Sequence, residues 1–168
     1  MKLTGKLEKA INAQVTMEFE AAVVYRQLAI EMDVQDLPGI SQWFFAQSDE
    51  ELVHAHKFIS HMTDRDAHPK IAAMPAPGLE IATVLDAFKA ALANEEKVSE
   101  SIRGLYRLAQ EEGDIDALPL LTWFISEQLE EESTVSEIIG RVQLIGEDGN
   151  GLLRLDAELG TRVPGAAE

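Results

Sequence analysis

Two side chains able to bind a metal lie three residues apart in the stretch QSDEELVHAHKF, residues 47–58. Glu51 and His54 are separated by one helical turn, so a helix would present both on the same face. Phe44 and Phe58 share that face, because helical spacing relates them to the pair. The sequence therefore directs a carboxylate and an imidazole toward an apolar core, where a bound cation would compensate for their burial.

Four segments of the chain carry a core-facing stripe that is apolar at both ends and polar in the middle. Each stripe has one glutamate near its midpoint, so in any parallel or antiparallel packing all four arrive at the same level. These glutamates are Glu18, Glu51, Glu95 and Glu131. No lysine or arginine stands near the middle of any stripe to neutralise them.

The expected chemistry is the binding of two divalent cations. Four buried carboxylates cannot all remain ionised without partners, because each burial costs several kcal/mol and like charges raise one another's pKa. Oxygen and nitrogen ligands without sulfur favour iron or manganese over copper, with zinc as a competitor. We expect Glu51 to bridge the two metals, His54 to bind one of them and Gln128 to lie nearby. The alternative, in which the glutamates face water, would expose four phenylalanines together. They are Phe44, Phe58, Phe88 and Phe124.

Composition narrows the class of protein. The 168 residues are 46% apolar and favour one domain spanning 1–168. The 30 acidic and 14 basic residues give a net charge of -16, which disfavours nucleic acid or an anionic membrane as a partner. The chain has no cysteine, which excludes disulfides and thiolate chemistry. Without a signal-like or membrane-spanning segment, we expect a cytoplasmic protein.

Periodicity predicts an all-α fold, a four-helix bundle over about residues 3–146. The expected helices are residues 3–33, 40–64, 79–110 and 117–145, followed by a short fifth helix at about 150–160 and a flexible tail, 161–168. The connection at 66–78 carries three prolines and could span about 43 Å, close to the length of one of these helices. Helices two and three should therefore run parallel, joined by one long crossover.

Four motifs resemble those of the non-haem bacterial ferritins, in the same order and over nearly the whole chain. The motifs are MEFEAAVVY from Met17, DEELVHAH from Asp49, ANEEKV around Glu95, and SEQLEEE from Ser126. The resemblance implies a ferritin-like bundle with a di-iron centre. By motif, the first iron site corresponds to Glu18, Glu51 and His54, and the second to Glu95, Glu131 and the shared Glu51. It also assigns Gln128 as a neighbouring amide, Tyr25 as a tyrosine beside the centre, and Glu50, Glu127 and Glu130 as a third iron site.

The function implied by this resemblance is iron storage with ferroxidase activity. Fe(II) would be oxidised by dioxygen or hydrogen peroxide, and Fe(III) mineral would be stored inside a hollow homo-oligomer of 24 subunits. Bacterioferritins also resemble the chain, but they carry a methionine haem ligand where this sequence has Leu52, so we expect no haem. The alternatives are a di-iron oxygenase, a rubrerythrin-like peroxidase and a metal-free structural bundle. A mini-ferritin is less favoured, because its metal site lies between subunits.

Overall fold

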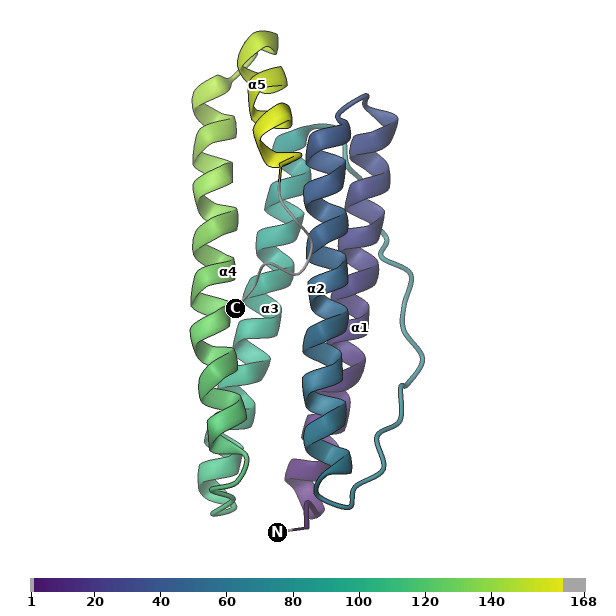
Figure 1. Ribbon diagram of the computed structural model, residues 1–168, viewed down its shortest axis with the longest axis vertical. Coiled ribbons are helices and arrows are strands. Elements are labelled where there is room, and N and C mark those ends of the chain that lie inside the picture. Colours follow the sequence, from purple (N-terminus) through teal and green to yellow (C-terminus); the bar gives the residue numbers. More distant parts are fainter. Residues whose placement is uncertain (1, 162–168) are drawn as a thin grey trace.

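The computed structural model describes residues 2–161, which contain five helices and no strand. The helices are α1 (Gly5–Val34), α2 (Pro38–Thr63), α3 (Val84–Glu111), α4 (Leu118–Ile145) and α5 (Gly149–Leu159). In Figure 1, α1 runs upward and α2 downward; residues 64–83 then return along the outside of the bundle. Helix α3 consequently runs parallel to α2, and α4 antiparallel to α3 (Figure 1). The predicted all-α bundle with one long crossover is confirmed.

The start of α3 differs from the prediction by five residues. We expected a helix from Leu79, whereas α3 begins at Val84. Thr83 is the N-cap: its Oγ1 accepts from Asp86 N at 3.1 Å, and Thr83 N donates to Asp86 Oδ2 at 2.9 Å. This capping box ends the extended segment at a defined residue. Leu79 and Ile81 lie in the crossover and pack against the core from there.

The crossover is attached to α1 by two side chains one helical turn apart. Asn12 pairs with the backbone of Lys70 in both directions, with hydrogen bonds of 3.1 and 2.7 Å. Thr16 Oγ1 accepts a third hydrogen bond, from Ala72 N at 3.1 Å. These bonds satisfy backbone groups of a segment that has no helical partners of its own.

The short helix α5 packs on the N-terminal end of α2. The N-cap residue of α2, Leu37, provides no side-chain hydrogen bond. Asp156 Oδ1 on α5 instead accepts a hydrogen bond from Ile40 N at 2.8 Å and so caps α2. A Cβ atom on Gly39 would lie 1.9 Å from the backbone oxygen of Asp156. Only glycine allows this approach at position 39.

Two apolar clusters occupy the two halves of the bundle. One contains Phe44 and Phe88, and the other contains Phe58 and Phe124; all four phenylalanines are fully buried. The alternative orientation of the helices, in which the glutamates face water and these rings are exposed, is therefore excluded. Between the clusters lies the level of the four glutamates. Within the described residues, no helix is both long and apolar enough to cross a membrane.

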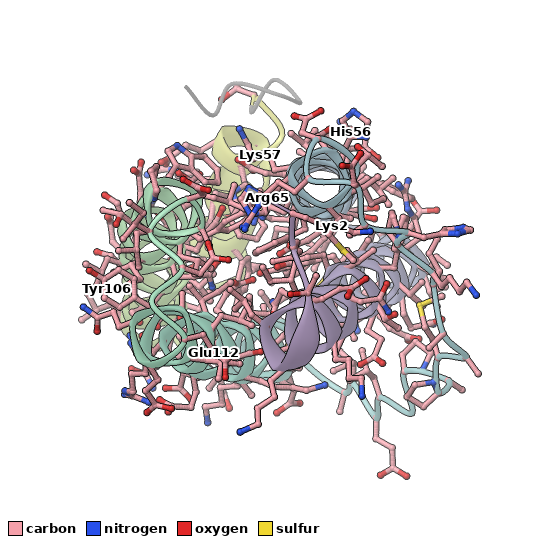
Figure 2. The ribbon with its side chains drawn as sticks, turned by 90° about the horizontal axis from the view of Figure 1, so that it is seen from below. Lys2, His56, Lys57, Arg65, Tyr106 and Glu112 are labelled. Atoms are coloured by element: carbon pink, nitrogen blue, oxygen red, sulfur yellow. The ribbon has the colours of Figure 1, made fainter. Side chains whose placement is uncertain are left out.

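The lower end of the bundle is closed by an ion pair. Arg65, just after α2, makes two hydrogen bonds to Asp114 in the turn between α3 and α4, at 2.7 and 3.0 Å. Its backbone oxygen accepts from Leu3 N at 3.1 Å. Figure 2, seen from below, shows the four long helices surrounding a shared interior, with α1 beside α3 and Arg65 at this end.

Candidate metal centre

The four glutamates predicted to face one another come from four different helices and are all buried. Glu18 on α1 and Glu95 on α3 are 0% exposed, Glu51 on α2 is 1% exposed, and Glu131 on α4 is 6% exposed. Helical periodicity explains the burial, because each glutamate continues the apolar stripe of its own helix. The middle of the bundle is therefore acidic rather than apolar.

Glu18, Glu51 and His54 form a compact group of possible metal ligands. One ligand atom from each lies within 4.8 Å of the others, and all three residues are buried. His54 Nδ1 is 3.2 Å from Glu51 Oε2. Gln14 Nε2 donates to Glu18 Oε1 at 2.8 Å, whereas Glu18 Oε2 is buried without a hydrogen-bond partner in the described part of the chain. A buried carboxylate oxygen in this position fits coordination of a cation.

Glu95 and Glu131 stand apart from that group, each held by neighbouring polar side chains. The Tyr25 hydroxyl donates to Glu95 Oε1, and Gln128 Nε2 donates to Glu95 Oε2 at 3.0 Å. Gln47 Nε2 donates to Glu131 Oε2 at 2.9 Å. The ligand atoms of these two glutamates belong to neither of the clusters found within 4.8 Å among the described residues. Their charges nevertheless act on Glu51, so all four carboxylates share one electrostatic environment.

Burial makes the ionised forms of these carboxyl groups unfavourable. It raises the pKa of Glu18 well above its ordinary value, and the charge of Glu51 raises it further. The pKa of Glu51 is likewise raised well above its ordinary value, first by burial and then by Glu95 and Glu131. Burial also raises the pKa of Glu95, against the lowering effect of the hydrogen bond from Tyr25. Bound divalent cations would remove this repulsion and favour the ionised forms.

A second group of ligand atoms lies next to the first and shares His54. Glu50, His54 and Glu127 bring one ligand atom each within 4.8 Å of one another. Partial burial raises the pKa of Glu127, and Glu50 raises it as well. Of the three residues predicted to form a third iron site, the structure thus brings Glu50 and Glu127 together. Glu130 is exposed and lies outside the group.

The other histidines lie away from both groups. His56 and His68 are exposed, and His61 Nε2 lies 3.2 Å from Arg65 Nη1 at the lower end of the bundle. In Figure 2, His56 is at the periphery, on the outer side of α2.

Two buried glutamines, Gln14 and Gln47, contact the centre but were not among the predicted site residues. A sequence signal was present: Gln14 lies four residues before Glu18, and Gln47 lies four residues before Glu51, within the same stripes. This spacing does not predict which carboxylate each amide contacts, because Gln47 donates to Glu131 on another helix.

A comparison with family models finds a ferritin-like domain over residues 8–145. This chain belongs to the ferritin family. The bacterial non-heme ferritin of Staphylococcus aureus is 33% identical over 161 residues, which cover 96% of this chain and 97% of that protein. The bacterial non-heme ferritin of Staphylococcus haemolyticus is 34% identical over 160 residues, covering 95% and 96%.

Solved ferritin structures have the same fold. The open pore ferritin of the hyperthermophilic archaeon Archaeoglobus fulgidus matches with a TM-score of 0.94 and 34% identity, covering 96% of this chain and 100% of that one. A humanized archaeal ferritin matches with a TM-score of 0.94 and 33% identity. The predicted family is therefore confirmed. Membership supports iron storage, and the group of carboxylates and a histidine fits metal binding.

Proposed function

We propose that this ferritin oxidises Fe(II) at a di-iron centre inside each subunit and stores the Fe(III) product as a mineral. One observation carries the proposal: glutamates from four helices are buried at one level, beside His54. None of the hydrogen bonds or ion pairs described for Glu18, Glu51 and Glu95 involves a lysine or arginine. The substrate cations would supply the missing positive charge.

The ligand roles follow from the donor atoms and from the ferritin motifs. Glu18 and His54 would bind the first iron, Glu95 and Glu131 would bind the second, and Glu51 would bridge them. Because only one ion receives an imidazole, the two sites are chemically unequal. Gln128 and Tyr25 hold Glu95 by hydrogen bonds and would keep its carboxylate oriented.

The reaction transfers one electron from each Fe(II). Dioxygen would accept two electrons and two protons and become hydrogen peroxide; hydrogen peroxide would accept two electrons and two protons and become two water molecules. The carboxylates would hold iron in both oxidation states, because hard oxygen ligands suit Fe(III) as well as Fe(II). The protein supplies the geometry and access, and the metals perform the redox chemistry.

Glu50, Glu127 and Glu130 are proposed as a third iron site beside the pair. The cluster of Glu50, His54 and Glu127 supports the first two members. Glu130 is exposed one turn after Glu127 and would join them by a change of side-chain rotamer.

Storage requires an enclosed volume, so we propose a hollow homo-oligomer of 24 subunits in the cytoplasm. Large apolar side chains on the surface of the single subunit support assembly: Val34, Ile115 and Leu144 are 76%, 70% and 89% exposed. Such side chains favour burial against another surface.

The test is gel filtration of purified protein after stepwise addition of Fe(II) in air, with iron assayed across the peaks. Storage predicts iron far above two ions per chain on one very large particle. Saturation near two ions per chain on a small oligomer would instead indicate a di-iron enzyme without storage. Absence of co-eluting iron would refute the metal function.

A variant isolates the role of the centre. We expect Glu51→Ala to abolish rapid Fe(II) oxidation while the particle keeps its size, because the bridging ligand is lost. Stopped-flow absorbance at the Fe(III) band measures the initial rate, and an unchanged rate would refute the assignment of the centre. Exposed Glu137→Ala on α4 serves as the matched control.

A further inference from the structure

Three buried glutamines each donate an amide hydrogen bond to one of the four central glutamates. All three side chains are at most 2% exposed. The bonds are Gln14 Nε2 to Glu18 Oε1 at 2.8 Å, Gln47 Nε2 to Glu131 Oε2 at 2.9 Å and Gln128 Nε2 to Glu95 Oε2 at 3.0 Å. Each glutamate proposed to bind a single iron thus has one carboxylate oxygen held by an amide.

The amide of Gln14 is fixed at both of its ends. Its Oε1 accepts a hydrogen bond from the Ser101 hydroxyl of α3, while its Nε2 donates to Glu18. The acceptor-only carboxylate of Glu18 selects the amide nitrogen, and the Ser101 hydroxyl holds the oxygen at the other end. An amide nitrogen attracts an ionised carboxylate, whereas an amide oxygen in the same place would repel it.

Glu18 shows the consequence of this arrangement. Its Oε1 is occupied by the amide of Gln14, and its Oε2 is buried without a hydrogen-bond partner among the described residues. The amide thus restrains the carboxylate and leaves Oε2 without a donor, while Glu18 belongs to the ligand group with Glu51 and His54.

We propose that Gln14 and Ser101 are positioning residues for the iron bound by Glu18, a role that rests on the proposed ferroxidase function. Ser101 anchors the oxygen of the Gln14 amide, and Gln14 holds Oε1 of Glu18, so that Oε2 would be free to bind the metal. Outer hydrogen-bond partners of metal ligands act in this way, and their loss typically lowers metal affinity by about 10- to 100-fold.

Gln47 provides a contrast within the same centre. Its Nε2 donates to Glu131, but its Oε1 is buried and has no hydrogen-bond partner in the described part of the chain. Its amide is therefore held at one end only, and it acts on a glutamate of the other proposed iron site. Removing the amide of Gln14 and removing that of Gln47 should therefore weaken the binding of two different metal ions.

The experiment is a titration of the metal-free oligomer with Co(II), followed by calorimetry and by visible absorption. For Gln14→Leu we expect one binding step to weaken by about 10- to 100-fold, with a changed Co(II) spectrum for that ion. For Gln47→Leu we expect a different step to weaken. Circular dichroism and gel filtration verify that each variant remains folded and assembled.

Ser101 provides a matched pair of variants outside the ligand set. Ser101→Ala removes the hydroxyl and should weaken the same step as Gln14→Leu by about threefold to tenfold, the effect of one hydrogen bond. Ser101→Thr keeps the hydroxyl and should restore the wild-type affinity. Ser101 is only partly buried, so this pair tests the proposal even if Gln14→Leu does not fold.

The outcomes separate this inference from the proposed function. Wild-type affinity in both Gln14→Leu and Ser101→Ala would overturn the positioning role and leave the ferroxidase centre intact. Equal losses in Ser101→Ala and Ser101→Thr would show that the hydroxyl is not the cause, which also overturns it. Failure of the wild-type protein to bind Co(II) would overturn the proposed function itself.

Discussion

Replacing Glu51 by glutamine should stabilise the metal-free protein and reduce the further stabilisation that bound metal provides. Glu51 is 1% exposed and lies among other carboxylates, so its charge is unfavourable when no cation is bound. Glutamine has nearly the same volume and carries no charge. Its amide also offers a donor to the neighbouring Glu18 carboxylate at any pH.

The magnitude follows from the separation of the charges. Ligand atoms of Glu18 and Glu51 lie within 4.8 Å of each other. At that distance and an effective dielectric constant of about 20, two unit charges repel by about 3.5 kcal/mol. Proton uptake relieves part of this repulsion, because burial raises both pKa values. We therefore expect a gain of about 2 kcal/mol at neutral pH, or about 4–8 °C in melting temperature.

The assay is thermal unfolding followed by circular dichroism, at matched protein concentration, with chelator present. The raised pKa values determine the sign of the pH dependence. Their contribution to wild-type stability is fully present below the ordinary carboxyl pKa and is lost as pH rises through the raised pKa of the folded protein. The advantage of Glu51→Gln should therefore grow as pH rises through the raised pKa values and shrink as pH falls toward the ordinary carboxyl pKa.

When Co(II) is added, the wild type should melt at a higher temperature than Glu51→Gln, the reverse of the metal-free order. A ligand at about 100 times its Kd stabilises the folded state by about 2.7 kcal/mol, a gain that the variant largely loses with its bridging ligand. If metal-free Glu51→Gln melts below the wild type at neutral pH, the reasoning from buried charge repulsion is wrong.

Three further substitutions test the elements that support the centre. Asp156→Ala should destabilise the protein by about 1 kcal/mol in urea unfolding, because Ile40 N loses its cap; an unchanged midpoint would contradict this. Arg65→Met should cost about 2 kcal/mol by removing two hydrogen bonds between charged groups, while Asp114 keeps its bond from Ala117 N. Since Arg65 lowers the pKa of Asp114, that stability is present above the ordinary Asp pKa and lost as pH falls through the lowered one, so the wild type and Arg65→Met should converge in acid. Thr83→Ala should cost about 1 kcal/mol and increase hydrogen exchange in the first turn of α3, which mass spectrometry would detect.

The register of the four glutamates could be predicted from the sequence because it depends on helical period alone. A residue four or seven positions from a buried phenylalanine faces the same way, so Glu51 was placed by Phe44 and Phe58. The crossover was predictable for a similar reason, since chain length limits topology. The start of α3 was not, because Ile81 lies four residues before Leu85, as in a continuing helix, and the cap at Thr83 depends on side-chain hydrogen bonds.

Contacts between helices were the least predictable part of the site. Gln14 and Gln47 occupy equivalent places before a glutamate, yet one donates to its own helix and the other to α4. Which of these occurs depends on rotamers and on the distance between helices, neither of which has a periodic signal.

The two apolar clusters above and below the glutamates make the bundle a rigid frame around a replaceable middle layer. Each cluster contains residues of all four long helices, so apolar packing on both sides of the glutamates supports the spacing between the ligands. Substitutions that change the charge or the donor atoms of this layer can therefore alter which metal is bound without altering the architecture. The same separation leaves the chemistry of the centre free to diverge while the fold is retained.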